Sequence, residues 1–327
     1  MPETYSAWCL HETEGTVTAR LETREVAALR ATGGVLIRGA WAGVNYKDAL
    51  AVLNRAKIVR AFPCIPGIEV TGTVEASDDA RFAPGDAVIV HGFGLGADRD
   101  GGFTQRLAVP ADLVVKLPAA LSLREAGIVG VAGYTAALAI DAMEVNGLTP
   151  SRGPVAVNGA TGGVASLAID MLAGLGYEVH AITRQADDGW LRTLGASQVL
   201  APPAVGRRPL EAANWAGVVD SLGGTALDGL LRTMRQDGVI AAFGNAMGND
   251  LATSVLPLIL RGVRLLGINA NSPMPLRERI WSRIATDLRP RHAADIGRTV
   301  ALTNLPDVCE TLIAGNGRGR FVVDLQG

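Results

Sequence analysis

The chain has 327 residues, of which 48% are hydrophobic and 19% are charged, and its formal net charge is −2. This length predicts two domains, and the apolar content excludes an intrinsically disordered protein. The near-neutral charge gives no bulk electrostatic reason to expect nucleic-acid or membrane partners.

Targeting and redox signals are sparse. The N-terminal residues are acidic rather than basic, and the longest apolar stretch, 127–140, is too short and too glycine-rich to cross a bilayer. We therefore expect a soluble cytoplasmic enzyme. Cys9, Cys64 and Cys309 lie far apart and are odd in number, which excludes a disulfide framework and a CxxC-type zinc site. We expect each to be a small buried side chain.

The sequence predicts an α/β protein in which a β-rich part is followed by a part with alternating helices and strands. Residues 1 to about 122 are β-rich, and strands are predicted at 35–38, 69–74 and 86–90. Beyond that point helices alternate with strands, which predicts a doubly wound parallel sheet. The predicted helices are 123–141 and 167–175, and the strands are 155–158, 178–183, 217–220, 238–243 and 264–268. A last strand, 320–324, is expected to return to the sheet of the first domain.

Residues 154–166 form the most informative run. An apolar strand stops at a turn of small residues, and an apolar helix pattern follows. Small residues let the backbone approach a pyrophosphate, and a helix N-terminus offers free N–H groups. This order predicts a dinucleotide site, and the alternative is a tight turn that binds nothing.

The end of the next predicted strand bears on which dinucleotide binds. Thr183, Arg184 and Gln185 stand where an NAD enzyme carries an acidic residue, and Thr183 follows Gly159 at the spacing expected of a ribose contact. A hydroxyl and a guanidinium suit a 2′-phosphate, whereas a carboxylate would repel it. The sequence favours NADPH, although Arg184 could be an ordinary solvated arginine. Asp187 and Asp188, the nearest acids, lie farther along.

Several segments resemble the medium-chain dehydrogenase/reductase superfamily. They are Gly67–Gly72, Pro84–Val88 and Gly133–Ala136, which precede the dinucleotide run in the order typical of that superfamily. More narrowly, the chain is similar to the acryloyl-CoA reductase group of the quinone oxidoreductase-like branch. The segments that carry this similarity are 45–50, 62–69, 194–197, 215–217 and 257–265.

The resemblance implies a division of labour between two domains. It implies a GroES-like catalytic domain from residues 1–122 with 296–327, and an NADP-binding Rossmann domain from 123–295. It also implies a homodimer, and an NADPH-dependent reduction of the C=C bond of a small 2-enoyl-CoA. The alternatives are an NADPH:quinone oxidoreductase and an NADPH-binding protein without catalytic activity.

The resemblance to the superfamily also indicates whether this protein binds zinc. Ala42 and Ile68 stand where zinc enzymes of the superfamily carry Cys and His, and neither can bind a metal. The four histidines show no ligand spacing. We expect a zinc-free member of the superfamily, for which reduction of an activated C=C bond fits better than alcohol oxidation.

The chain departs from the group at three places. Arg184 comes one position early, Ala165 replaces the third glycine of the turn, and 98–100 reads Asp-Arg-Asp where a His and an aromatic residue are usual. The first departure bears on the phosphate contact, and the last bears on the acyl group.

Catalytic candidates lie in the Asn-Tyr-Lys-Asp motif. Hydride addition to an enoyl thioester builds charge on the thioester oxygen, so a hydrogen-bond donor is needed there. We assign that donor to Tyr46, whose phenol could also contact the nicotinamide ribose or relay a proton. Asn45 could hold the nicotinamide or the substrate carbonyl, and Asp48 could orient Tyr46. The alternatives are a packed tyrosine, a turn-forming asparagine and a local pair of Lys47 with Asp48.

Cofactor contacts are expected at the edge of the sheet where the strands end. The predicted set is Tyr46, Thr135, Thr161, Gly162, Gly163, Val164, Ala165, Thr183, Arg184, Gln185, Leu222, Gly244, Asn269 and Arg320. A CoA thioester would also need cations for its phosphates, and the candidates are Lys57, Arg60, Arg99, Arg261 and Arg264. These could equally be scattered surface residues.

Overall fold

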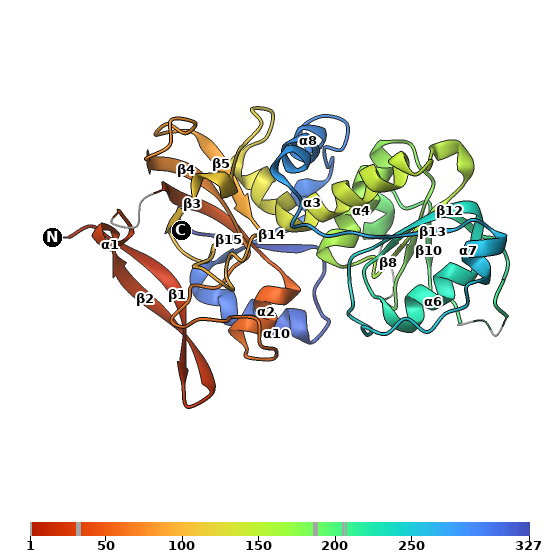
Figure 1. Cartoon of the computed structure of the whole chain (residues 1–327), viewed down its shortest axis with the longest axis horizontal. Coiled ribbons are helices and arrows are strands. Elements are labelled where there is room, and N and C mark those ends of the chain that lie inside the picture. Colours follow the sequence, from red (N-terminus) through yellow and green to blue (C-terminus); the bar gives the residue numbers. More distant parts are fainter. Residues whose placement is uncertain (1, 31–33, 186–188, 205, 207) are drawn as a thin grey trace. The chain divides into compact units, whose positions relative to one another are not determined.

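The computed structural model describes residues 2–30, 34–185, 189–204, 206 and 208–327, so Asp187 and Asp188 lie outside the described residues. Internal contacts divide the chain into two compact units (Figure 1). The first comprises Met1–Val131, Asn271–Trp281 and Ala293–Gly327, and the second comprises Ala132–Ala270 and Ser282–His292. The domain division that the resemblance implies, 1–122 with 296–327 and 123–295, differs from these units at 123–131, 271–281 and 293–295, and it stays a prediction.

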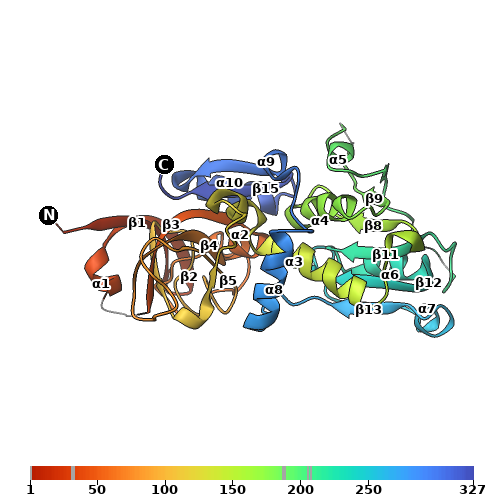
Figure 2. The same cartoon turned by 90° about the horizontal axis from the view of Figure 1, so that it is seen from above.

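An antiparallel-rich sheet forms the centre of the first unit. Its order is β14-β15-β3-β4-β5-β7, with β6 paired to β3, and β1 and β2 form a separate hairpin. The strands are β1 (Thr4–Thr13), β2 (Thr16–Glu25), β3 (Val35–Val44), β4 (Glu69–Ser77), β5 (Ala87–His91), β6 (Arg106–Val109), β7 (Val114–Lys116), β14 (Gly297–Ala301) and β15 (Arg320–Asp324). The predicted return of 320–324 to this sheet is confirmed, because β15 pairs antiparallel with β3 (Figure 2).

Short helices cover this sheet. They are α1 (Val26–Arg30), α2 (Tyr46–Val52), α9 (Ala293–Ile296) and α10 (Leu305–Ile313), with 3-10 turns at Ala111–Leu113 and Leu302–Asn304. Helix α10 packs against α2, and its Cys309 belongs to the hydrophobic core that residues of the sheet form with residues of these two helices. The prediction for the cysteines is confirmed, since Cys9, Cys64 and Cys309 are free and buried.

The second unit is a sheet of six parallel strands in the order β10-β9-β8-β11-β12-β13. The strands are β8 (Val155–Asn158), β9 (Val179–Ile182), β10 (Gln198–Leu200), β11 (Trp215–Asp220), β12 (Met234–Ala242) and β13 (Arg264–Gly267). The helices are α4 (Gly163–Gly174), α5 (Trp190–Thr193), α6 (Gly224–Arg232) and α7 (Leu256–Leu260), with a 3-10 turn at Pro150–Arg152. Helices α4 and α6 lie on opposite faces of the sheet (Figure 1). The predicted doubly wound sheet is confirmed, and its winding reverses between β8 and β11.

Helix α3 (Leu123–Val145) runs from the first unit into the second. Gly130 interrupts it with φ 46° and ψ −152°, a conformation open to glycine but not to other residues. Within the described residues, α3 is the one helix whose length and composition would suit a membrane span. Its apolar window is 94% buried inside the protein, so we assign it to the core.

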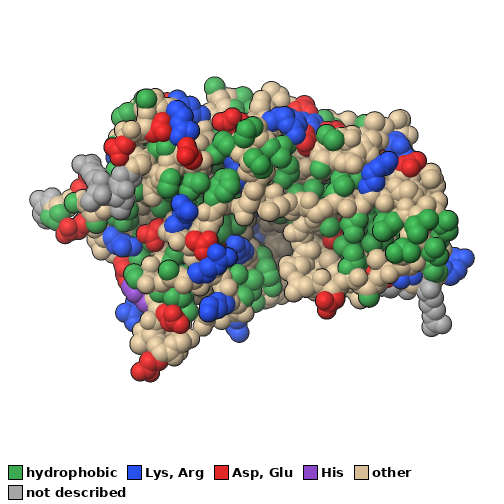
Figure 3. All heavy atoms as spheres, in the orientation of Figure 1, with side chains coloured by type: hydrophobic (Ala, Val, Ile, Leu, Met, Phe, Trp, Pro, Cys, Tyr) green, Lys and Arg blue, Asp and Glu red, His purple; other side chains and the backbone are tan. Residues whose placement is uncertain are grey.

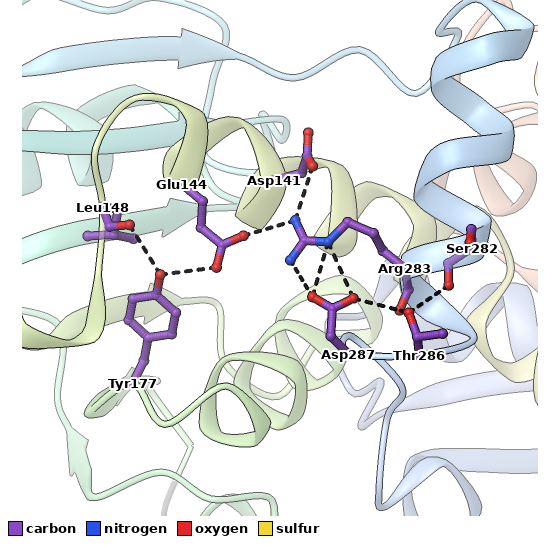
Figure 4. A network of polar contacts seen from close by, with 8 residues as sticks. All are labelled: Asp141, Glu144, Leu148, Tyr177, Ser282, Arg283, Thr286 and Asp287. Carbon is purple, nitrogen blue, oxygen red and sulfur yellow. Dashed lines mark hydrogen bonds and ion pairs between the residues drawn. The ribbon is translucent and has the colours of Figure 1, made fainter.

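Helix α8 (Met274–Ile284) and the residues after it are anchored by two polar clusters. In the first unit, the Trp281 indole N–H donates to His91 Nε2 at 3.0 Å. In the second unit, the Arg283 guanidinium contacts Asp141 at 3.0 Å, Glu144 at 2.9 Å and Asp287 at 2.6 Å (Figure 4). These contacts explain why the unit boundary falls between Trp281 and Ser282.

Candidate functional site

The turn between β8 and α4 presents backbone N–H groups at the end of a central strand. Gly159 has φ +62°, and Gly162 is the N-cap of α4 with φ −73° and ψ 161°. Among the described residues, no side chain caps this helix. Residues 161–164 are half-buried, and Ala165 is buried. The start of this 12-residue helix therefore suits an anion, and a cofactor contact by Thr161 to Ala165 stays a prediction.

A buried pair fixes the neighbouring loop at the point where the winding reverses. The Asn158 amide at the end of β8 donates to Asp220 at the end of β11, and both side chains are almost fully buried. Asn158 Oδ1 accepts from Ser221 N at 2.8 Å, and Asp220 Oδ2 accepts from Gly223 N at 3.0 Å. Burial raises the pKa of Asp220, while its hydrogen bonds lower it, and the direction that results is upward.

Close backbone contacts bring several predicted residues to this loop. A Cβ at Gly244 would lie 2.0 Å from Ser221 O. A Cβ at Gly159 would lie 2.4 Å from Ser221 Oγ and 3.2 Å from the Leu222 side chain. The structure therefore groups Leu222 and Gly244 with the glycine turn. The sequence did not single out Asn158 or Asp220, although a polar residue at the end of an apolar strand was the available signal.

Polar groups also follow the end of β9, where a contact with the cofactor ribose is predicted. Thr183 is buried, and its Oγ1 accepts from Gln185 N at 3.1 Å. Arg184 and Gln185 are exposed. Two other residues that were predicted to contact the cofactor lie in other elements. Thr135 is a buried residue of α3, and Asn269 is an exposed residue that follows the edge strand β13.

The motif around Tyr46 sits where β3 passes into α2 in the first unit. Asn45 is the N-cap of α2, with φ −109° and ψ 160°. Tyr46 is the first helical residue and is 50% exposed. This exposure does not match a tyrosine packed in a core, which was the alternative to a functional role.

Asp48 supports the N-cap from inside the protein. The carboxylate is 2% exposed, and its Oδ2 accepts from Asn45 N at 2.8 Å and from Asn45 Nδ2 at 3.0 Å. Its Oδ1 accepts from Ile68 N at 3.0 Å. Burial raises the pKa of Asp48 to about 7 against the opposing effect of these hydrogen bonds. Asp48 therefore holds Asn45 rather than Lys47, which is exposed.

A buried ion pair holds the other end of the Asn45 amide. Arg320 is 2% exposed and pairs with Glu69, which is equally buried. The Arg320 guanidinium also donates to Asn45 Oδ1 at 2.7 Å and to Ile128 O at 3.1 Å. Glu69 accepts from Val131 N, next to the interruption in α3. A direct contact of Arg320 with a cofactor stays a prediction, and these bonds favour a positioning role.

The prediction that this protein binds no zinc concerns residues of the first unit. Across the described part of the chain, no group of three or more His, Cys, Asp and Glu side chains is close enough to hold a metal ion. Ala42, at one of the positions where zinc enzymes of the superfamily bind metal, is buried in β3. Asp98 and Asp100 belong to the segment 98–100, whose sequence differs from the acryloyl-CoA reductase group. Asp98 pairs with Arg60 at 2.7 Å, and Asp100 accepts a hydrogen bond from Ile65 N at 2.9 Å.

Comparison with known proteins places this architecture in a family. Residues 31–119 match the model of the alcohol dehydrogenase GroES-like domain. The acrylyl-CoA reductase AcuI of Ruegeria pomeroyi is 43% identical over 298 residues, which is 90% of either chain. YhfP of Bacillus subtilis, whose name assigns it to the quinone oxidoreductases, is 44% identical over 299 residues, 89% of this chain and 90% of that one.

Solved structures agree with this placement. The yhdH oxidoreductase of Salmonella enterica, crystallised with NADP, superposes with a TM-score of 0.94 at 40% identity and covers 98% of this chain and 100% of that one. Bacillus subtilis yhfP with NAD bound gives a TM-score of 0.94 at 39% identity and covers 99% and 100%. The chain belongs to the medium-chain dehydrogenase/reductase superfamily and, within it, to the group that contains AcuI and YhfP.

Proposed function

We propose that this chain is an NADPH-dependent reductase of the C=C bond of a small 2-enoyl-CoA, with conversion of acrylyl-CoA to propionyl-CoA as the representative reaction. The names of its AcuI relative and the NADP in the Salmonella structure support this function. The observation that carries it most is the half-exposed Tyr46 beside an asparagine that is fixed at both ends of its amide.

The second unit fits the cofactor. Its uncapped α4 suits the pyrophosphate, and the exposed Arg184 suits a 2′-phosphate because no carboxylate stands beside it at 183–185. The residues that would hold NADPH are Thr161 to Ala165, Thr183 to Gln185, Leu222 and Gly244, with Thr135 and Asn269 as further contacts. When bound, NADPH supplies the hydride.

The chemistry assigns a role to each residue of the motif. Hydride addition to the β-carbon shifts the C=C electron pair toward the thioester, whose oxygen becomes negative. Tyr46 donates a hydrogen bond to that oxygen and relays a proton to the α-carbon, which completes the saturated thioester. Asn45 would hold a carbonyl of the substrate or of the nicotinamide with the amide N–H that donates to Gly43 O at 3.3 Å in this structure. Asp48 and Arg320 hold Asn45 at the orientation this requires.

We propose that the reaction runs without zinc. Ala42 and Ile68 have no metal-binding atom in their side chains, so the oxyanion depends on hydrogen-bond donors of the chain and not on a Lewis acid at those positions. The free, buried cysteines are consistent with a reducing compartment, and we propose the cytoplasm as the location.

Stopped-flow NADPH oxidation, read at the nicotinamide absorbance band, tests the function with acrylyl-CoA and a benzoquinone under identical conditions. Fast turnover of acrylyl-CoA with little quinone activity is the expected result. Turnover of the quinone alone would contradict the proposal and favour the function in the name of the YhfP relative. NADPH binding without turnover of either substrate would indicate a protein without this catalytic activity.

We also propose a homodimer formed through β13, the edge strand of the six-stranded sheet. The neighbouring α7 and its N-cap residue carry exposed apolar side chains, among them Val255 at 59%, Ile259 at 69% and Leu260 at 58% exposure. A second copy that pairs at this edge would cover the unpaired backbone groups and these side chains together.

A further inference from the structure

A cavity of about 360 Å³ lies at the C-terminal end of α2, outside the groups described so far. We propose that it binds the 3′-phosphoadenosine diphosphate end of a CoA thioester, an inference that rests on the proposed function. Its walls come from α2, from the loop after α2 and from the tip of the β1–β2 hairpin. All of these elements belong to the first unit.

The cavity wall is fixed by backbone hydrogen bonds. Asn54 has φ +51°, a conformation that asparagine tolerates and that ends α2. Arg55 N donates to Leu50 O at 2.8 Å, and Arg60 N donates to Ala97 O at 3.0 Å. Farther on, Cys64 forms two backbone hydrogen bonds with Leu10 of β1. The loop therefore presents its side chains from a set position, which limits the entropy lost on binding.

The lining combines cations with an apolar floor. Arg55, Lys57 and Arg60 are exposed and lie within six residues of one another. The floor is formed by Val17, Ile58, Val59 and Phe62, which pack in one hydrophobic cluster. An aromatic base against such a floor, with phosphates at the cations, is the arrangement that an adenine nucleotide needs.

The charges around the cavity favour an anion. Asp98 neutralises part of the Arg60 charge through an ion pair at 2.7 Å, and Glu12 is the acid among the residues that line the cavity. Arg55 and Lys57 remain to meet a ligand phosphate. Figure 3 shows Lys and Arg side chains gathered over the region of α2.

Sequence analysis left open which cations would bind the CoA phosphates, and the structure distinguishes those with a structural role from those that line the cavity. Arg261 donates to Met234 O at 2.7 Å and to Glu211 O at 2.6 Å, which gives it a structural role in the second unit. Lys57 and Arg60 line the cavity instead, and Arg55 joins them. Sequence reasoning missed Arg55 because nothing in its local pattern separates it from a solvated arginine.

The position of the cavity suits a long substrate. Tyr46 is the first residue of α2, and Ala51, which lines the cavity, comes five residues later. At the rise of an α-helix this separates the two Cα atoms by about 8 Å along the axis. The flexible pantetheine arm of CoA easily covers such a distance, so one helix can serve both the reacting thioester and the phosphates.

Steady-state kinetics of the Arg55→Glu/Lys57→Glu variant test the site with two substrates, acrylyl-CoA and acrylyl-pantetheine, which lacks the nucleotide. We expect the KM for acrylyl-CoA to rise at least about 10-fold, because two charge-assisted phosphate contacts are replaced by repulsion. Neither kcat nor the KM for acrylyl-pantetheine should change. Arg20→Glu/Arg298→Glu makes the same change of charge at exposed positions elsewhere in the unit and should leave both KM values unchanged.

Calorimetric titration with 3′,5′-ADP separates this proposal from the proposed function. The wild type should bind 3′,5′-ADP, the Arg55→Glu/Lys57→Glu variant should lose that binding, and Glu12→Gln should tighten it. Equal binding by the wild type and the double variant, or an equal KM change for both thioesters, would overturn the phosphate site. Failure to reduce either thioester would overturn the proposed function, and the titration alone would then decide whether the cavity binds the nucleotide.

Discussion

The Asn45 side chain illustrates how single residues are positioned in this protein. Its amide nitrogen donates to the Asp48 carboxylate, and its oxygen accepts from the Arg320 guanidinium. Both partners are 2% exposed, so water does not compete for these hydrogen bonds. Tyr46, the next residue, has instead an exposed phenol on a backbone whose direction is fixed by its neighbour.

Replacing Tyr46 by Phe tests the assigned donor. Loss of a hydrogen-bond donor to a developing oxyanion typically lowers turnover roughly 10²-fold to 10³-fold, so we expect kcat for acrylyl-CoA to fall by at least that lower factor. NADPH affinity, measured by fluorescence titration, should change little. Lys47→Met, at the exposed adjacent position, is the matched control. Unchanged turnover in Tyr46→Phe would remove Tyr46 from the mechanism.

Asp48 predicts a pH dependence of stability. Its pKa of about 7 in the folded protein lies above its ordinary value of 3.8, so the folded state holds the extra proton between these values. The contribution of Asp48 to the free energy of unfolding therefore falls as pH rises from 4 to 7, by at most about 4 kcal/mol, and is constant above pH 7. Urea unfolding of the wild type and of Asp48→Asn at several pH values measures it. The difference between the two should change over this range, and parallel curves would contradict the assignment.

Arg184 predicts the choice between the two dinucleotides. An arginine–phosphate hydrogen bond contributes roughly 1.5–3 kcal/mol, so Arg184→Ala should raise the KM for NADPH about 10-fold or more. The KM for NADH, which has no 2′-phosphate, serves as the internal control and should stay constant. An equal rise for both cofactors would mean that Arg184 acts on the fold of the loop and not on the phosphate.

At the scale of elements, the strand–turn–helix segment was the most predictable part of the chain. Its signals are local: β-branched residues in β8, small residues in the turn and apolar periodicity in α4. The N-terminal hairpin was not predicted, because β2 is mostly exposed and its apolar alternation, at Val17, Ala19 and Leu21, covers only the first half of the strand. The interruption of α3 was missed as well, since Gly130 takes its conformation beside the buried Glu69 and Arg320.

The turn itself gives a prediction with a matched control. Gly159→Ala would place a Cβ 2.4 Å from Ser221 Oγ at φ +62°, whereas Gly176→Ala meets nothing within 4 Å at φ +82°. Each carries a backbone cost of about 1 kcal/mol for a left-handed residue. We expect both to lower the melting temperature, Gly159→Ala by more, and only Gly159→Ala to weaken NADPH binding. Adding Ser221→Ala should restore part of that binding, and no restoration would place the effect elsewhere in the turn.

At the scale of the whole chain, the sequence predicted the two sheet types and the return of the last strand, but not the long-range polar pairs. Glu69 and Arg320 are 251 residues apart, and Asn158 and Asp220 are 62 apart. Each is a single charged or polar residue in or beside an apolar strand, so burial could be suspected. The partner of each residue could not be predicted from the sequence, because pairing depends on which strands the fold brings together. Removing one member of the Glu69 and Arg320 pair would leave a buried charge without compensation.

The proposed dimer is the prediction that concerns the whole molecule. Ile259, on α7 beside the edge strand β13, is 69% exposed, so Ile259→Asp should not disturb the core of its own subunit. In a homodimer through this edge it would bury an unpaired carboxylate, which costs several kcal/mol and should shift the mass measured by sedimentation from dimer to monomer. Val145→Asp changes a residue that is 77% exposed at the end of α3, outside α7 and β13, and should leave the mass unchanged. A dimer that persists in Ile259→Asp would mean that the copies associate through another surface.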